Sequence, residues 1–293
     1  GNFNVATQGK RQPGSSFKPF VYAVGFEKGF TDKTTLWDVV TNFGKGRGDK
    51  DYIPHNYDLK ERGPLSVRVA LANSLNIPAV KMLYLTGPET VINRAREFGY
   101  TTLKDASQYG LSLVLGGAEV TLLEHTAAYG TFAAEGLKRA TANLLKVEDS
   151  RCTVLFEKKE NKATKVMEPE IARQLTDILS DNEARTPTFG SRNFLTLGDR
   201  PVAAKTGTTN DYRDAWTMGY APNLAAGVWV GRNNFTPMKR GADGSVVAAP
   251  IWNRFMRNAL AKKAIENFTK PNITYPEKAV LNGSLETGLP VKI

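Results

Sequence analysis

Apolar residues recur at helical spacing through much of the first part of the chain. A first helix is predicted over residues 14–29, where it begins at Ser15 and ends at Gly29. Pro19 falls in its first turn or just after it, where the missing N–H does little harm. Helical periodicity returns in four further segments, which are 66–76, 78–98, 119–135 and 168–181.

The pattern changes after residue 200, where three short apolar runs are separated by short polar linkers. The runs are RPVAAKTGTT, DAWTMGYAP and AAGVWVGR, and the linkers are NDYR and NL. This spacing is typical of an antiparallel meander. A helix, PIWNRFMRNALAKKAIE, follows the meander. Helices, then an antiparallel sheet, then a helix packed on that sheet predict an α+β fold rather than a Rossmann arrangement.

Three other stretches lack helical periodicity. Residues 41–64 are rich in Gly, Asp and Lys and contain two prolines, so they are predicted to form a long surface excursion. Residues 138–167 are charged and favour β-structure. The tail from Phe268 holds three prolines and is predicted to be an extended arm or the start of a further module.

These patterns predict one domain over residues 1–267 and an extended arm over 268–293. A helical lobe is expected over about 30–185 and a sheet lobe over about 195–267. The helix at 14–29 is expected at the interface of the two lobes.

The composition restricts the class of protein but does not by itself indicate a function. The 293 residues are 41% hydrophobic and 23% charged, which is ordinary for a globular protein with a substantial core. No stretch approaches about 18 consecutive apolar residues. The net charge of +10 raises the question of nucleic acid, but the basic residues are spread along the chain without interleaved aromatics. A solvated basic surface is favoured, with attraction to an anionic membrane or wall polymer as a secondary effect.

Cysteine and histidine are too scarce for several kinds of site. The single Cys152 excludes an internal disulfide. His55 and His125 are the only histidines, and no H-E-x-x-H or Cys/His spacing occurs. A zinc enzyme is therefore not expected, and nothing in the sequence calls for another metal or an organic cofactor. A hydrolase or acyl transferase built on this chain would need a base other than histidine.

Ser15 and Lys18 offer such a pair. They lie at i and i+3, so their side chains can share one face of the predicted helix. A serine at a helix N-terminus also has free backbone N–H groups nearby, which suit an attack that generates an oxyanion. Lys18 can act as a base only if its pKa falls by several units from about 10.4. Burial and a second nearby ammonium would lower it, so another lysine is expected close in space.

The sequence AAKTGTTND supplies that lysine as Lys205, in the first predicted strand of the meander. Gly207 would let a substrate backbone approach the strand. The hydroxyls of Thr206 and Thr208 point to one face, because side chains alternate along a strand. A cation beside two hydroxyls is a reasonable seat for a carboxylate.

A third element, S-x-N, occurs three times, at 74–76, 180–182 and 191–193. The literal S-D-N at 180 ends a predicted helix, and the match at 191 lies in a loop. Both suit a plain helix stop or turn, since Ser, Asp and Asn favour such places. The match at 74 lies between two predicted helices, where a hydroxyl and an amide can face a cleft. We therefore choose Ser74 and Asn76.

Serine with lysine at i+3, then S-x-N, then K-T-G is the motif order of penicillin-binding proteins and serine β-lactamases. Four longer stretches resemble the transpeptidase domain of class A, bifunctional penicillin-binding proteins. They are RQPGSSFKPFVYA, PHNYDLKERGPLSVRVALANSLNIPAVK, LVLGGAEVTLLEHTAAYGTFAAEG and AAKTGTTNDYRDAWTMGYAPNLAAGVWVGRNN. The resemblance runs from residue 1 to about residue 266. It implies an α+β transpeptidase fold with a helical lobe and an antiparallel sheet flanked by helices.

The resemblance implies a serine acyl-enzyme mechanism. Ser15 would attack the D-Ala-D-Ala carbonyl of a peptidoglycan stem peptide and release the terminal D-Ala. An amino group of a neighbouring stem would then attack the acyl-enzyme and form the cross-link. Lys18 would take the Ser15 proton and Ser74 would relay a proton to the leaving amine. The identity of the base is disputed in this superfamily.

The resemblance also implies the binding groups. Asn76 would hold the amide of the acyl chain. Lys205, Thr206 and Thr208, with Gly207 between the threonines, would bind the donor carboxylate or the carboxylate of a β-lactam. The backbone N–H groups of Ser15 and Thr208 would form the oxyanion hole.

Class A members carry a membrane anchor and a glycosyltransferase domain upstream, and strands of their sheet precede the nucleophile helix. Only 14 residues precede Ser15 here, so a piece of a longer protein that lacks those N-terminal strands is expected. The resemblance implies an extracytoplasmic location, in the periplasm or on the outer face of the bacterial membrane. The implied partners are stem peptides, lipid-linked glycan strands, β-lactam antibiotics and proteins of a cell-wall synthesis complex, without nucleic acid.

Three alternative functions share part of this pattern. A class A β-lactamase would show an E-x-x-L-N loop between S-x-N and K-T-G, and none occurs there, so this reading is disfavoured. A D,D-carboxypeptidase would use water as the acceptor, and the sequence alone leaves that open. A non-catalytic sensor domain would bind β-lactams and stay acylated. The class A flanking stretches argue against the last two.

Overall fold

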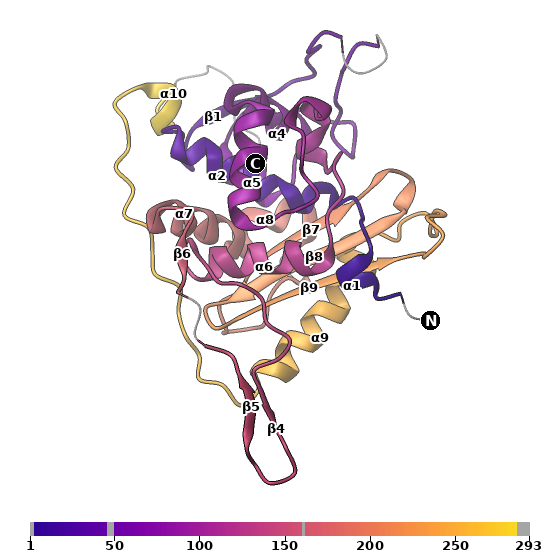
Figure 1. Ribbon diagram of the computed structural model, residues 1–293. Coiled ribbons are helices and arrows are strands. Elements are labelled where there is room, and N and C mark those ends of the chain that lie inside the picture. The colour runs from indigo at the N-terminus through magenta and orange to yellow at the C-terminus, as the bar shows by residue number, and fades with distance from the viewer. Residues whose placement is uncertain (1–2, 46–49, 160–161, 286–293) are drawn as a thin grey trace.

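A computed structural model describes residues 3–45, 50–159 and 162–285 of the chain (Figure 1). The predicted surface excursion and the predicted terminal arm therefore lie partly outside the described residues. A helical layer packs on one face of a three-stranded antiparallel sheet, and a single helix covers the other face (Figure 1). The architecture is α+β, as the sequence predicts.

The helical layer is built around α2 (Lys18–Glu27), which is buried at nine of its ten residues. A helix that is apolar on all sides needs neighbours on all sides. They include α4 (Asn76–Thr86) and α5 (Pro88–Phe98). Gly25 allows α2 and α4 to approach closely, because a Cβ there would lie 2.6 Å from Met82 Sδ. No helix within the described residues is long and apolar enough to span a bilayer.

Two predicted helices differ in their limits. The segment 78–98 is two helices rather than one, because Gly87 adopts φ +84° and Pro88 starts a new helix. The segment 66–76 is not one helix, because α3 (Val67–Ala72) ends before Ser74, which adopts φ +57°, and Asn76 already begins α4. The remaining helices of this layer are α6 (Leu122–Ala133), α7 (Pro169–Ser180) and α8 (Asn182–Phe189).

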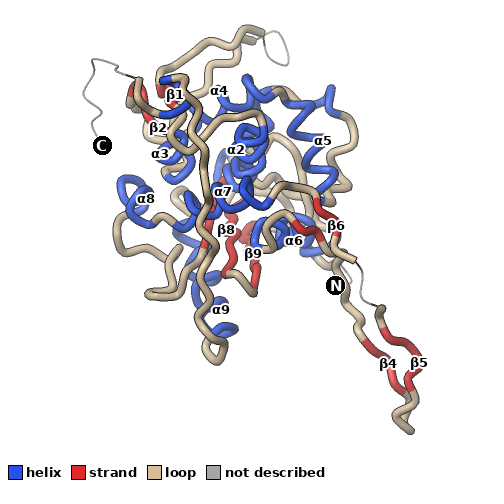
Figure 2. Tube along the Cα trace, turned by 90° about the vertical axis from the view of Figure 1, so that its left-hand side faces the viewer, coloured by secondary structure: helices blue, strands red, loops and turns tan. Residues whose placement is uncertain are grey.

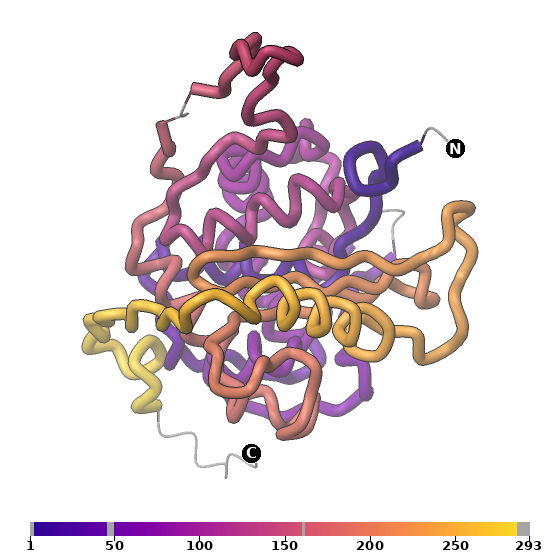
Figure 3. Tube along the Cα trace, turned by 90° about the horizontal axis from the view of Figure 1, so that it is seen from below, coloured from indigo at the N-terminus to yellow at the C-terminus, as the bar shows by residue number. Residues whose placement is uncertain are grey.

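The meander forms as predicted, with β7 (Ala203–Thr208), β8 (Asp214–Ala221) and β9 (Leu224–Gly231) in that spatial order. Glycines in the strands let a helix approach each face. A Cβ on Gly227 would meet Thr126 of α6, whereas one on Gly219 would meet Trp252 of α9 (Ala249–Leu260). Helix α9 lies along the strands on the face opposite the helical layer (Figure 3). The sheet therefore separates two apolar cores.

The segment 138–167, predicted to favour β-structure, forms only short strands. In the hairpin of β4 (Lys146–Glu148) and β5 (Val154–Glu157), the side chains of β5 are exposed. Figure 2 shows this hairpin projecting away from the rest of the molecule. The other short strands pair as β1 (Thr35–Asp38) with β2 (Gly63–Ser66) and β3 (Leu137–Lys138) with β6 (Thr164–Lys165).

Short helical turns complete the described elements. They are α1 (Val5–Gln8), η1 (Gly14–Phe17), η3 (Ala106–Gln108), η4 (Leu111–Leu115), η5 (Asn210–Tyr212), η6 (Gly244–Ala248) and α10 (Ala279–Asn282).

After α9 the chain runs back along the outside of the helical layer to α10 (Figure 1). Three side chains fasten it there. Phe268 packs edge-on against Tyr220, Lys270 pairs with Asp177, and the hydroxyl of Tyr275 donates to Asp32. The carbonyl of Leu281 accepts hydrogen bonds from Thr31 and Thr34. The arm thus packs on the domain surface as an extended strap.

Candidate active site

Ser15 lies in η1, a single 3-10 turn that leads directly into α2. The predicted helix 14–29 therefore has two parts, and the α-helix proper begins at Lys18. Gly14 has φ +56°, and a Cβ there would lie 2.6 Å from the carbonyl oxygen of Thr208. Only glycine satisfies both the dihedral and the contact. The turn that carries Ser15 is thus held directly against the backbone of β7.

Gly207 of β7 also contributes to the close packing of the Ser15 turn on the sheet. A Cβ on Gly207 would lie 2.2 Å from the carbonyl oxygen of Pro13 and 2.9 Å from Ser16 Oγ. The sequence suggested that this glycine admits a substrate backbone. The structure gives a different reason, because the space beside Gly207 is filled by η1 itself.

Lys18 points from the start of α2 toward the turn between α3 and α4. Its Nζ donates to the carbonyl oxygen of Ser74 at 2.6 Å and to Asn76 Oδ1 at 2.8 Å. Its distance to Ser74 Oγ is 3.5 Å. A neutral amine has two N–H groups and one lone pair, so two short donated bonds leave the lone pair free. None of these bonds goes to the hydroxyl of Ser15.

Burial is the main cause of the low pKa of Lys18. The side chain is 0% exposed, and desolvation, followed by repulsion from Lys205, holds its pKa well below the ordinary value. These are the two causes that a lysine base requires. The structure thus brings Lys18 and the second lysine to one place, the Ser74 hydroxyl.

Lys205 reaches this hydroxyl from the sheet. Its Nζ donates to Ser74 Oγ at 2.6 Å and to its neighbour's carbonyl, that of Thr206, at 3.0 Å. Burial, followed by the nearby charge of Arg185, lowers the pKa of Lys205 to about 7. Lys205 therefore titrates near neutral pH, where small changes in its surroundings alter its charge.

Arg185 is a residue that sequence reasoning missed. It lies in α8, is 3% exposed, and donates to the carbonyl oxygens of Leu179 and Asp181, while its Nη1 has no hydrogen-bond partner. Helix α8 is tied to the Ser74 turn, because Asn73 donates to the carbonyl of Ala184 at 2.8 Å. Nothing in the sequence around this arginine, which stands between a predicted helix and a loop, indicates that it is buried near the active-site lysines.

The Ser74 turn is formed by its own backbone. Ser74 adopts φ +57° between α3 and α4, and its N–H donates to the carbonyl of Leu71. This left-handed residue ends one helix and aims its side chain and carbonyl at the two lysines. The other two S-x-N matches are structural. Asp181 caps α8, and Asn193 bonds to Asn182 and Gly190 within a loop.

Asn76 is held by a buried pair that sequence reasoning also missed. Asn56 accepts the N–H of Asn76 at 2.8 Å, and its amide donates to both carboxylate oxygens of Asp38 at 2.7 and 2.9 Å. Asn76 Nδ2 donates to the carbonyl of His55 at 2.9 Å. Asn56 belongs to the segment predicted as a surface excursion. Part of that excursion therefore builds the candidate site.

Thr206 and Thr208 lie on the face of β7 opposite Lys205 and Gly207, as alternation requires. Thr206 is buried, and Thr208 Oγ1 accepts the N–H of Gly244 at 3.1 Å. The backbone of Thr208 lies directly against Gly14, next to Ser15. Two backbone segments that could serve one oxyanion are therefore neighbours.

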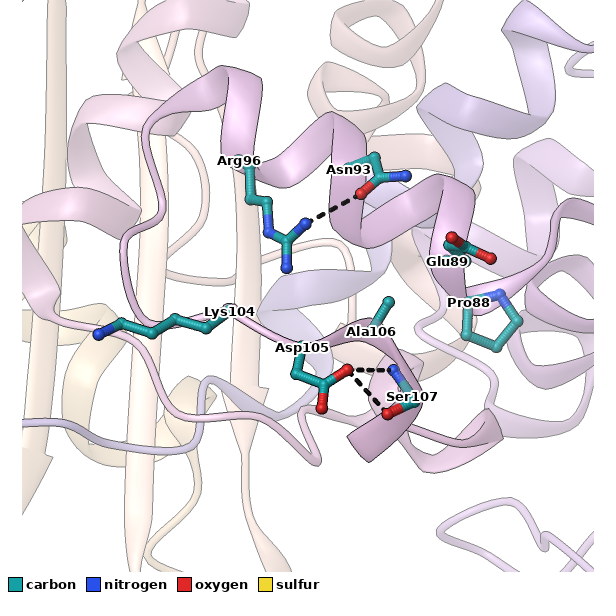
Figure 4. A pocket seen from close by; sticks show the side chains of 8 residues that line it. All are labelled: Pro88, Glu89, Asn93, Arg96, Lys104, Asp105, Ala106 and Ser107. Atoms are coloured by element: carbon teal, nitrogen blue, oxygen red, sulfur yellow. Dashed lines mark hydrogen bonds between the residues drawn. The ribbon is translucent and has the colours of Figure 1, made fainter.

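Among the described residues, no group of three His, Cys, Asp or Glu side chains is placed to hold a metal ion. His55 is exposed and His125 is fully buried, in keeping with non-catalytic places. A separate polar hollow of about 580 Å³ lies between α5 and η3 (Figure 4). Within it, Arg96 donates to Asn93, and Asp105 accepts from Ser107. It shares no residue with the Ser15 cluster.

The model of the penicillin-binding protein transpeptidase domain matches residues 2–257. The chain belongs to the penicillin-binding protein transpeptidase family. It is 35% identical to penicillin-binding protein 1A of Aquifex aeolicus (strain VF5), over 96% of this chain and 37% of the relative. It is 33% identical to penicillin-binding protein 1A of Neisseria flavescens, over 96% of this chain and 35% of that relative. The chain thus spans about a third of the length of these curated relatives.

Solved structures agree with this assignment. Penicillin-binding protein 1A from Haemophilus influenzae matches with a TM-score of 0.84 and 28% identity, over 96% of this chain and 47% of that chain. PonA1 from Mycobacterium tuberculosis, in complex with penicillin V, matches with a TM-score of 0.79 and 26% identity, over 93% of this chain and 75% of that chain. The predicted family and the predicted fold are therefore confirmed. The chain is a penicillin-binding transpeptidase domain, and the β-lactamase, carboxypeptidase and sensor alternatives are not favoured.

Proposed function

We propose that this domain cross-links peptidoglycan through an acyl-enzyme on Ser15. The hydroxyl of Ser15 attacks the carbonyl of the penultimate D-Ala of a stem peptide, and the terminal D-Ala leaves. An amino group of a neighbouring stem then attacks the ester and releases Ser15. The observation that carries the proposal is the meeting of Lys18 and Lys205 at the Ser74 hydroxyl, beside the turn that holds Ser15.

The proton route follows from these contacts. Lys18 has a depressed pKa and a free lone pair, so it accepts the Ser15 proton as the bond to carbon forms. The leaving D-Ala amine needs a proton, which the Ser74 hydroxyl donates. Ser74 is re-protonated by a lysine, and Lys205 Nζ at 2.6 Å is the nearer one. Deacylation by the acceptor amine reverses the same transfers.

The remaining residues bind the donor. Asn76 presents its amide beside Lys18 and holds the amide of the acyl chain. Lys205 in its protonated form binds the donor carboxylate at the outer edge of β7, an edge strand of the described sheet, and the hydroxyls of Thr206 and Thr208 border the same edge from the opposite face of the strand. Backbone N–H groups of Ser15 and Thr208 stabilise the oxyanion. The close packing of Gly14 on Thr208 supports this pairing.

We further propose that the domain works as part of a longer bifunctional protein. Its curated relatives are about three times as long and carry the name penicillin-binding protein 1A. Such a protein would add a membrane anchor and a peptidoglycan glycosyltransferase domain, and would act outside the cytoplasm. Stem peptides on lipid-linked glycan strands would be its substrates, β-lactams its covalent inhibitors and cell-wall synthesis proteins its partners. The 1–267 region would form the domain, and the arm from 268 would pack on its outside.

Intact-mass spectrometry after incubation with benzylpenicillin tests the proposal. The wild-type chain should gain one adduct that lasts for hours, and Ser15→Ala should gain none. Ser191→Ala, which changes an exposed serine of a rejected S-x-N match, should behave like the wild type. An adduct that clears within seconds would indicate a hydrolase, and a folded wild-type chain without an adduct would refute Ser15 as nucleophile. Release of D-Ala from a stem pentapeptide, measured with and without an added amine, separates transfer from hydrolysis. Release that requires the amine indicates transfer, whereas release without it indicates hydrolysis.

A further inference from the structure

A line of buried hydrogen bonds lies behind the Ser15 turn. The hydroxyl of Tyr100 bonds to His125 Nδ1 at 2.6 Å, and His125 Nε2 bonds to Ser16 Oγ at 2.8 Å. Ser16 Oγ in turn donates to the carbonyl of Pro13 at 2.6 Å. Pro13 and Ser16 flank Gly14 and Ser15, so the line ends on both sides of the proposed nucleophile.

The directions of these bonds follow from the number of protons. The Ser16 hydroxyl has one proton, which it gives to the carbonyl of Pro13, so it accepts from His125 Nε2–H. His125 Nδ1 then carries no proton and accepts from Tyr100. Burial lowers the pKa of His125 to about 3, which keeps the ring neutral in this tautomer.

Burial excludes a direct chemical role for this line. Ser16 and His125 are 0% exposed and Tyr100 is 3% exposed. A substrate carbonyl cannot reach Ser16 Oγ, so the Ser–His–Tyr order is not a nucleophilic triad. Its effect must pass through the backbone of the Ser15 turn.

Helix α6 holds this turn from two points. His125 and Tyr129 lie one helical turn apart on the same face of α6. The hydroxyl of Tyr129 donates to the backbone carbonyl of Ser16 at 2.7 Å, while His125 binds the Ser16 side chain. On the other side, Gly14 and Gly207 leave no space between η1 and β7. The turn is therefore clamped between α6 and the sheet.

We propose that His125 is a positioning residue for Ser15, which it orients by binding Ser16 and, through Ser16, the carbonyl of Pro13. The inference rests on the proposed acylation of Ser15. It assigns His125 to the rate of the chemical step, not to binding of the donor, because none of the hydrogen bonds of the line goes to the lysines or to the Ser74 turn. A turn displaced by a fraction of an ångström moves the Ser15 oxygen out of line with the carbonyl it attacks.

Acylation by benzylpenicillin, followed by rapid-quench intact mass over a range of drug concentrations, separates the two effects. His125→Phe keeps the ring shape but removes both nitrogens. It should lower the limiting acylation rate by about 10- to 100-fold and change the pre-acylation dissociation constant by less than about twofold. His125→Gln retains a donor and an acceptor and should restore most of the rate. Ser16→Ala should lower the rate like His125→Phe, and the two changes combined should cost no more than either alone.

Thr176→Val is the matched control, because it removes a buried hydrogen bond to Tyr220 elsewhere in the core. It should lower the melting temperature and leave the limiting rate unchanged. A wild-type rate in folded His125→Phe, or no restoration by His125→Gln, would overturn the proposal. If His125→Phe does not fold, Ser16→Ala provides the test instead. A wild-type limiting rate of acylation in folded Ser16→Ala would also overturn the proposal. If the folded wild-type chain is not acylated at all, the proposed function itself fails, a distinct result.

Discussion

Lys205 Nζ donates a 2.6 Å hydrogen bond to the hydroxyl of Ser74, across 131 positions of the sequence. This bond joins β7 of the sheet to the turn between α3 and α4. Lys18 meets the same serine from a third direction, through its carbonyl at 2.6 Å and its hydroxyl at 3.5 Å. One serine thus connects two buried amines, as the proposed proton transfer without histidine requires.

Replacing Lys18 should remove the base, together with its hydrogen bonds to Ser74 and Asn76. Lys18→Met retains the buried stem, and the limiting rate of acylation by benzylpenicillin should fall by about 10²- to 10⁴-fold, the usual contribution of general base catalysis. Stopped-flow or quenched intact-mass kinetics would measure it. Lys10→Met, which changes an exposed lysine, should have no effect. An unchanged rate in folded Lys18→Met would mean that another group takes the Ser15 proton.

Binding of anionic ligands should depend on pH through Lys205. Its pKa is about 7, so the amine is protonated below that pH and becomes neutral as the pH rises through it. The dissociation constant of benzylpenicillin before acylation should therefore increase as the pH is raised from 6 to 8. A dissociation constant that stays constant over this range would contradict the assignment of Lys205 as the carboxylate site.

Arg185 should influence the pH at which Lys205 titrates, and therefore the midpoint of the pH dependence of ligand binding. Its buried charge is the second cause of the low pKa of Lys205, after desolvation. Arg185→Gln removes the charge and should move the midpoint for ligand binding to higher pH. Arg192→Gln, which changes an exposed arginine, should not move it. A midpoint that stays in place in Arg185→Gln would show that burial alone determines the pKa of Lys205.

Asn56 should support both stability and the site. Asn56→Ala removes the donors to Asp38 and the acceptor for the Asn76 N–H, which leaves a buried carboxylate poorly paired. The free energy of unfolding should fall by about 1–3 kcal/mol, and donor binding should weaken. Urea unfolding and acylation kinetics would measure the two effects. Asn223→Ala, at an exposed asparagine, is the control and should change neither.

The close packing of η1 on β7 should not tolerate a methyl group. Gly207→Ala would place a Cβ 2.2 Å from the carbonyl of Pro13, so the free energy of unfolding should fall by about 1–3 kcal/mol and acylation should slow. Gly110→Ala has nothing within 4 Å of the new Cβ and no positive φ, so it should be close to neutral. Equal stability of the two variants would refute the packing argument.

Local sequence patterns predicted much of the fold. Hydrophobic periodicity located most of the longer helices, although not α8 (Asn182–Phe189), and the three apolar runs predicted the meander, because both patterns report which side of one element is buried. The boundaries depended on single residues instead. Gly87 divides one predicted helix into two, and Ser74 ends another early, since a left-handed residue leaves the helical path.

The sequence by itself determined the order of the serine, lysine and K-T-G elements, because the chemistry restricts which residue types can stand at those short spacings. The resemblance of its longer stretches indicated the family. Only the tertiary structure decided how these elements meet. It joined Ser74 to both lysines, filled the space beside Gly207 with η1, and brought Arg185, Asn56 and His125 to the site. Their roles come from burial and from contacts between distant segments, as between His125 and Ser16, 109 positions apart. No pattern within one segment encodes such a contact, because each partner is selected by the packing of the whole chain.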